Sequence, residues 1–161
     1  MRTQADVVLH PGDLYFGRSP DVAYTLLGSC VAVTVWHPST KFGGMCHYLL
    51  AHRQPQPNVR SLPPGYFAND AFKFFDHKIK QYQLPIEELQ FKMFGGGNMF
   101  NQSLSSSINV AVANVNCGKQ LIEQRGWQLV SSSVGGSRYR KLFFDLDSGD
   151  VWLSYGNQEA S

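Results

Sequence analysis

Four short segments between residues 13 and 50 constrain the fold more than any other feature of the sequence. Residues 13–17, 22–27, 31–36 and 44–50 are rich in β-branched and aromatic side chains and are separated by Gly, Pro and Ser. Such segments are typical of strands, and residues 37–44 are typical of a hairpin loop. This part of the chain is therefore predicted to form β-sheet.

The hydrophobic period changes after the Pro-rich residues 51–65. Apolar side chains in residues 66–82 recur at steps of three and four, which predicts an amphipathic helix that ends before Pro85. A second helix is expected to start near Ser107 and to stop at Gly126, although Gly118 in its interior is unfavourable. The remaining segments are predicted strands: 89–94, 127–134, 141–147 and 151–156.

Strands outnumber helices in this reading, and clear βαβ alternation is missing. We therefore expect an α+β fold, with packed β-sheets forming a sandwich-like core flanked by two main helices. The 161 residues are expected to form a single domain over residues 1–161, since a chain of this length can bury a sizeable core.

Composition excludes several classes of function. The formal charge is +2 and no run of Lys or Arg forms a basic patch, so we expect no nucleic-acid partner. Cys30, Cys46 and Cys117 are an odd number without a CxxC pair, so neither a disulfide framework nor a structural zinc site is predicted. No metal or other cofactor is expected. No apolar stretch reaches about 18 residues. A cytoplasmic protein with reduced thiols and no membrane insertion is the expectation.

Cys30 follows a Gly28-Ser29 turn between two apolar strand segments. From this position alone it could be a packing residue, a metal ligand or a nucleophile. At the start of a strand, a nucleophile has its own backbone N–H free to donate to a developing oxyanion.

His47 is the natural partner of Cys30, because a hairpin could bring the two strands side by side. Strand alternation places Cys46 and His47 on opposite faces, so Cys46 is expected to pack in the core if His47 serves a site. His37 and His52 are the alternative bases. These two and the remaining histidines are most simply surface or turn residues, and Glu87-Glu88 is most simply a solvated pair.

The glycine-rich stretch at residues 95–97 fits neither a P-loop nor a dinucleotide fingerprint. Three glycines after a strand instead indicate unusual dihedral angles or a close approach of the backbone to another group.

Five motifs together carry a resemblance to a known family. They resemble the chemoreceptor glutamine deamidases, the CheD-type proteins of bacterial and archaeal chemotaxis, over residues 8–155. This resemblance implies a fold related to the toxin-type cysteine deamidases. The motifs occur in family order: "PGD" (11–13), "TLLGSCVAV" (25–33), "GGMCHYLL" (43–50), "KMFGGGNMF" (92–100) and "GGSRYRKLFFDLDSGDV" (135–151).

The resemblance implies an enzyme, a protein-glutamine glutaminase. Its family hydrolyses glutamine side chains in the cytoplasmic helices of chemoreceptors (methyl-accepting chemotaxis proteins) to glutamate and ammonia, and some members also act on glutamyl methyl esters. The family motif places the nucleophile at Cys30 and the histidine at His47, which would form a thiolate–imidazolium pair. Thr25 matches the third catalytic element, with Tyr24 one residue away.

Further expectations concern substrate and partners. Close approach of a receptor helix would involve five residues of the motifs: Ser29, Gly95, Gly96, Gly97 and Asn98. The resemblance implies a possible CheC-type phosphatase partner.

Two other interpretations of the function stay open. One is a mainly non-catalytic regulator of that phosphatase or of the receptor array, favoured by departures such as Ser133-Val134 where the family has Asp; the other is a papain-like protease or transamidase.

Overall fold

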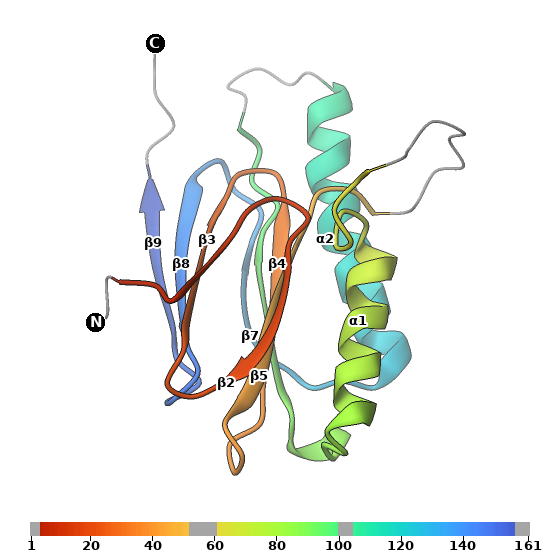
Figure 1. The fold of residues 1–161 in the computed structure, drawn as a ribbon. Coiled ribbons are helices and arrows are strands. Elements are labelled where there is room, and N and C mark those ends of the chain that lie inside the picture. The colour runs from red at the N-terminus through yellow and green to blue at the C-terminus, as the bar shows by residue number, and fades with distance from the viewer. Residues whose placement is uncertain (1–3, 52–60, 100–104, 157–161) are drawn as a thin grey trace.

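The computed structural model describes residues 4–51, 61–99 and 105–156. Two β-sheets stack on one another, and two helices cover the outer face of one of them (Figure 1). In chain order the elements are β1 (Val7–Leu9), β2 (Leu14–Arg18), β3 (Val22–Leu27), β4 (Val31–Trp36), β5 (Phe42–Tyr48), α1 (Ala68–Gln81), η1 (Ile86–Glu88), β6 (Gln90–Gly95), α2 (Ser105–Arg125), β7 (Leu129–Val134), β8 (Tyr139–Asp145) and β9 (Val151–Gly156).

The four-stranded sheet has the order β1-β3-β8-β9, and the five-stranded sheet has the order β2-β5-β4-β6-β7. Most neighbouring strands are antiparallel, but β1 pairs with β3 and β6 pairs with β7 in parallel. The predicted α+β class with packed sheets and two main helices is confirmed. All eight predicted strands are present, with ends shifted by up to two residues.

Two features of the topology were not predicted. β1, an edge strand of the four-stranded sheet, is only three residues long, and no strand was predicted before residue 13. The expectation of no βαβ alternation was incomplete, because β6, α2 and β7 form a parallel crossover unit. Short strands and a polar β7 carry little hydrophobic periodicity, and parallel pairing depends on the tertiary crossover.

Both helices pack against the five-stranded sheet, as Figure 1 shows. The Gly at position 118, unfavourable for helix propensity, is explained by a close contact. A Cβ there would lie 2.5 Å from Tyr48 Oη and 2.7 Å from Met93 Cε, so only glycine lets α2 approach β5 and β6 this closely.

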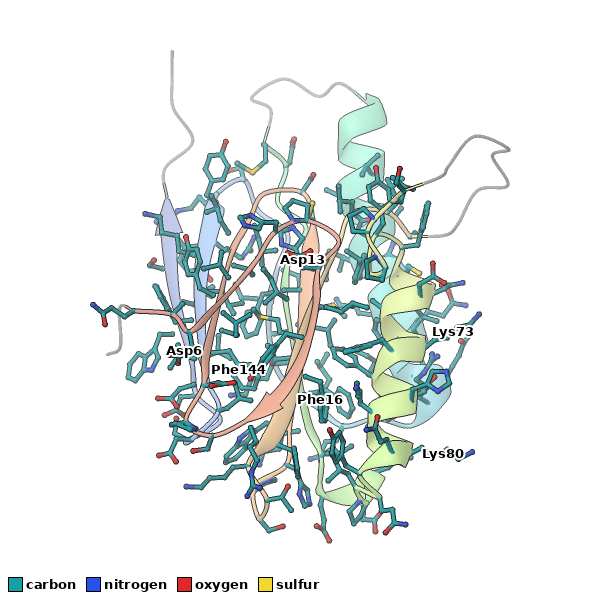
Figure 2. All side chains as sticks on the ribbon, in the orientation of Figure 1. Asp6, Asp13, Phe16, Lys73, Lys80 and Phe144 are labelled. Carbon is teal, nitrogen blue, oxygen red and sulfur yellow. The ribbon has the colours of Figure 1, made fainter. Side chains whose placement is uncertain are left out.

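The core has two layers, one on each face of the five-stranded sheet. Alternate residues of the central strand β4 divide between them: Val33 packs toward the helices, and Ala32 packs between the sheets. In Figure 2, Phe144 lies between the two sheets and Phe16 faces α1, whereas Lys73 and Lys80 point away from the sheets. Because both faces of β4 and β5 are covered, a side chain on either face is shielded from water.

Candidate active site

Cys30 lies where the chain crosses from one sheet to the other. β3 ends at Leu27 in the four-stranded sheet, a bend follows at residues 28–30, and β4 starts at Val31 in the five-stranded sheet. Cys30 is half-buried and packs at the edge of the core layer between the sheets. The predicted position of this thiol at a turn before a strand is confirmed.

His47 is buried on β5 and points into the space between the sheets. Its cross-strand partner on β4 is Ala32, so Cys30 is its diagonal neighbour on the same face of the sheet. Diagonal neighbours on two adjacent strands lie about 7–8 Å apart, and long side chains can reach across this distance. Cys46 points the opposite way, into the helix-side core, as alternation predicted.

Thr25 reaches His47 from the other sheet. Thr25 Oγ1 and His47 Nδ1 are 2.7 Å apart, and the same hydroxyl donates to the carbonyl of Leu9 at 2.8 Å. A threonine hydroxyl has one proton, and Leu9 uses it, so His47 Nδ1 must carry a hydrogen and donate to Thr25. Tyr24 instead packs against Phe143 in a tilted ring contact with centroids 4.7 Å apart, so Thr25 is the residue that meets the imidazole.

This tautomer leaves His47 Nε2 with a free lone pair. The atom is buried and makes no hydrogen bond with any described residue. Burial lowers the pKa of His47 to about 4, and the nearby Asp13 carboxylate opposes this shift only in part. The imidazole is therefore neutral near pH 7 and can accept a proton at Nε2.

The thiol of Cys30 is also neutral in the free protein. Burial raises its pKa to about 11, and a hydrogen bond from the Ser29 side chain acts in the opposite direction. The expected thiolate–imidazolium pair thus differs from the charge state that burial favours, which is a neutral thiol beside a neutral base. The sequence could not indicate this, because desolvation depends on how the two sheets pack.

The segment before β2 forms backbone hydrogen bonds with His47 on β5. The backbone N–H of Gly12 donates to the His47 carbonyl at 2.7 Å, and the His47 N–H donates to the Asp13 carbonyl at 3.3 Å. Asp13 is labelled in Figure 2. The "PGD" motif therefore fixes the backbone on both sides of the histidine side chain.

The glycine loop after β6 supports the turn that carries Cys30. Gly96 N–H donates to the Cys30 carbonyl at 2.8 Å, and Gly97 N–H donates to the Gly28 carbonyl at 2.9 Å. Gly95 has φ +113°, and a Cβ there would lie 2.2 Å from the Cys30 carbonyl oxygen. The close backbone approach predicted for these glycines is confirmed, and its partner is the turn that carries Cys30.

Ser29, within this turn, and Asn98, whose N–H donates to the Gly136 carbonyl at 2.8 Å, are half-buried, whereas Gly95, Gly96 and Gly97 are buried. Contact of any of them with substrate stays a prediction. A residue that the sequence reasoning missed is Asn114 on α2, a buried side chain that donates to the Ser29 carbonyl. Its signal was present, since it is a polar residue within the apolar stripe of the helix.

The alternative bases lie elsewhere or outside the described residues. His37 was expected to be a surface or turn residue; it lies at the turn after β4 but is only 3% exposed, with Thr40 at 2.6 Å and Glu88 at 2.7 Å. It sits at the other end of β4 from Cys30, and Glu88 is its partner instead of a purely solvated residue. His10 and His77 are exposed, and His52 lies outside the described residues.

Within residues 4–51, 61–99 and 105–156, no three His, Cys, Asp or Glu side chains are grouped to hold a metal ion. Among the helices in these ranges, none has the length and apolar character needed to cross a bilayer.

The sequence matches known proteins along most of its length. A family model described as "CheD chemotactic sensory transduction" matches residues 49–155. A protein of Dechloromonas aromatica (strain RCB), named "Probable chemoreceptor glutamine deamidase CheD 3", is 41% identical over 150 residues, which are 93% of this chain and 87% of that protein.

Two further relatives carry the same printed name apart from its final number. "Probable chemoreceptor glutamine deamidase CheD 1" of Chromobacterium violaceum is 40% identical over 155 residues, covering 96% of this chain and 79% of that protein. The "Probable chemoreceptor glutamine deamidase CheD 1" of Leptospira interrogans is 31% identical over 157 residues, covering 94% and 93%. These alignments reach beyond the family-model match, over nearly the whole chain.

Proposed function

The chain belongs to the CheD family, and from that premise we propose that it is a chemoreceptor glutamine deamidase with Cys30 as nucleophile and His47 as base. The observation that carries the proposal is the hydrogen bond between Thr25 and His47 across the two sheets. This bond leaves Nε2 of the neutral imidazole without a partner among the described residues. Cys30 is the diagonal neighbour of His47 on the same face of the sheet. A nucleophile, a base and a group that orients the base are the parts that such chemistry needs.

The first step joins Cys30 to the substrate. As Sγ attacks the carboxamide carbon of a glutamine side chain, the thiol proton passes to His47 Nε2, and the C=O electrons move onto oxygen. The backbone N–H of Cys30 donates to that oxyanion. Because thiol and imidazole start neutral, proton transfer accompanies the attack instead of preceding it.

The second half returns the enzyme to its starting state. The oxyanion collapses, the C–N bond breaks, and His47 gives its proton to the leaving nitrogen, so ammonia departs and a thioester remains. His47 then takes a proton from water as the water oxygen attacks the thioester. The C–S bond breaks, Sγ recovers the proton, and glutamate is the product. A glutamyl methyl ester would follow the same steps with methanol as leaving group.

Ser29, which precedes Cys30, and Asn98, which follows the glycine loop, are both half-buried and are the proposed contacts for the receptor helix. The buried Gly95, Gly96 and Gly97 would act mainly by holding the Cys30 turn, since the amides of Gly96 and Gly97 donate to this turn and the Gly95 carbonyl accepts from Gly135.

The test uses the cytoplasmic domain of a chemoreceptor, with deamidation followed by intact mass and by ammonia release. The wild-type chain should raise the substrate mass by the difference between an NH₂ and an OH group at each target glutamine. Cys30→Ala should abolish this gain, whereas the control Cys46→Ala removes a thiol on the opposite face of the sheet. Undiminished deamidation by Cys30→Ala would refute the mechanism, and peptide cleavage would point to a protease.

A second candidate is a mainly non-catalytic regulator that binds a CheC-type phosphatase or the receptor array. The raised pKa of Cys30 favours it, because a protonated thiol is a weaker nucleophile. If chemotaxis survives Cys30→Ala but is lost when the surface that binds the partner is blocked, the binding role is the important one.

A further inference from the structure

Asn114 is a buried amide on the face of α2 that packs against the five-stranded sheet. Asn114 is only 1% exposed, and the apolar residues Ala111 and Val115 on the same helix are also buried. A buried amide is costly unless it is hydrogen-bonded, so its partners indicate what it does. Nδ2 donates to the Leu49 carbonyl at 2.7 Å and lies 3.3 Å from the Ser29 carbonyl. Because both partners are acceptors, the orientation of the amide is fixed.

These two carbonyls belong to the two segments of the candidate active site. Leu49 follows His47 by two residues, directly after the last residue of β5. The Ser29 carbonyl shares a peptide unit with the Cys30 N–H. The helix itself is anchored at this point, because the Tyr48 hydroxyl donates to the Asn114 carbonyl at 2.5 Å. One residue of the helix layer therefore connects the turn of the nucleophile with the strand of the base.

We propose that Asn114 is a positioning residue that aims the Cys30 backbone N–H at the oxyanion of the reaction. This inference rests on the proposed function. The peptide unit between Ser29 and Cys30 is planar, and its C=O and N–H point in opposite directions within that plane. A hydrogen bond to the Ser29 oxygen therefore also fixes the direction of the Cys30 N–H. A bond to the oxygen also polarises the unit and makes the N–H a stronger donor. An oxyanion donor works only when it is aimed where the negative charge develops.

The proposal separates two reactions of the same thiol. Acylation of Cys30 passes through a tetrahedral oxyanion and needs the aimed N–H. Alkylation by iodoacetamide is a direct displacement at carbon with no oxyanion, so it depends on the thiol but not on this donor. A change that only loosens the fold would slow both reactions together.

The experiment compares Asn114→Ala with Asn116→Ala, which removes an exposed amide two residues along the same helix. Acetylation by p-nitrophenyl acetate and alkylation by iodoacetamide are measured at the Cys30 peptide by mass spectrometry, with Cys30→Ala as background. In Asn114→Ala we expect acetylation to fall by about ten-fold, a fraction of the loss seen when an oxyanion donor is removed outright. Alkylation should change by less than about two-fold, and Asn116→Ala should match the wild type in both.

Equal rates in Asn114→Ala and wild type would overturn the proposal, and so would a parallel fall of both reactions. If Asn114→Ala does not fold, as judged by its thermal midpoint, Asn114→Leu provides a second variant that fills a similar volume without the donor. Neither reagent requires a chemoreceptor. A wild-type chain that fails to deamidate receptors would therefore refute the proposed function while leaving the acetylation-to-alkylation ratio readable.

Discussion

Thr25 and His47 form a 2.7 Å hydrogen bond between strands of two different sheets. The bond can exist only where the sheets are packed face to face, because Thr25 lies on β3 and His47 on β5. It fixes the hydrogen on Nδ1 and leaves Nε2 as the basic atom of the imidazole.

Removing the Thr25 hydroxyl should therefore lower activity more than it lowers stability. In Thr25→Val, His47 Nδ1 loses its acceptor, and we expect kcat to fall by about ten- to a hundred-fold, a part of what a general base contributes. Thr25→Ser keeps the hydroxyl and should retain most of the activity. Deamidation kinetics of both variants check this, and equal activity of Thr25→Val and wild type would contradict the assigned orientation.

The reactivity of Cys30 should report a protonated thiol. With a pKa of about 11, its alkylation by iodoacetamide should rise about ten-fold per pH unit from neutral to alkaline pH. A preformed ion pair would instead give a plateau that begins below pH 7. Ser29→Ala removes a hydrogen bond that lowers this pKa, so its profile should move to higher pH. A flat profile in the wild type would show that the ion pair exists.

Folding stability should fall in acid because of His47. Its pKa is about 4 in the folded protein and about 6.5 when unfolded, so the unfolded state binds the extra proton between these values. This contribution is fully present above pH 6.5 and is lost as the pH falls to 4, at a cost of about 3 kcal/mol. His47→Asn, which can still donate to Thr25, should lack that part of the acid loss. Denaturant unfolding at pH 4 and pH 7 compares the two, and equal acid losses would argue against a buried neutral histidine.

The glycine loop offers a test of how the turn that carries Cys30 is held. Gly95→Ala places a Cβ against the Cys30 carbonyl as well as straining a positive φ, so it should destabilise the fold by about 3 kcal/mol and displace Cys30. Gly135→Ala is the matched control: its φ is +82°, but a Cβ there meets nothing within 4 Å. It should cost only about 1–2 kcal/mol in backbone strain. Thermal unfolding and Cys30 alkylation measure both effects, and equal losses would mean that the contact with Cys30 is unimportant.

Local patterns in the sequence were sufficient for eight of the nine strands, for the two helices and for the candidate residues Cys30 and His47, whereas Thr25 was expected only from the family resemblance. Period-two alternation alone placed Cys46 opposite His47, and the Gly-Ser turn alone placed Cys30 before a strand. These features follow from neighbouring residues, because backbone geometry fixes which side chains share a face.

Other features depended on contacts between distant segments, and only the tertiary structure decided them. The choice of Thr25 over Tyr24 follows from which face of β3 meets the other sheet. The neutral charge state of Cys30 and His47 follows from their burial, and the partners of Asn114 follow from the packing of α2 on β4 and β5. Desolvation and hydrogen bonding across a core are properties of the assembled layers, and no stretch of sequence contains them.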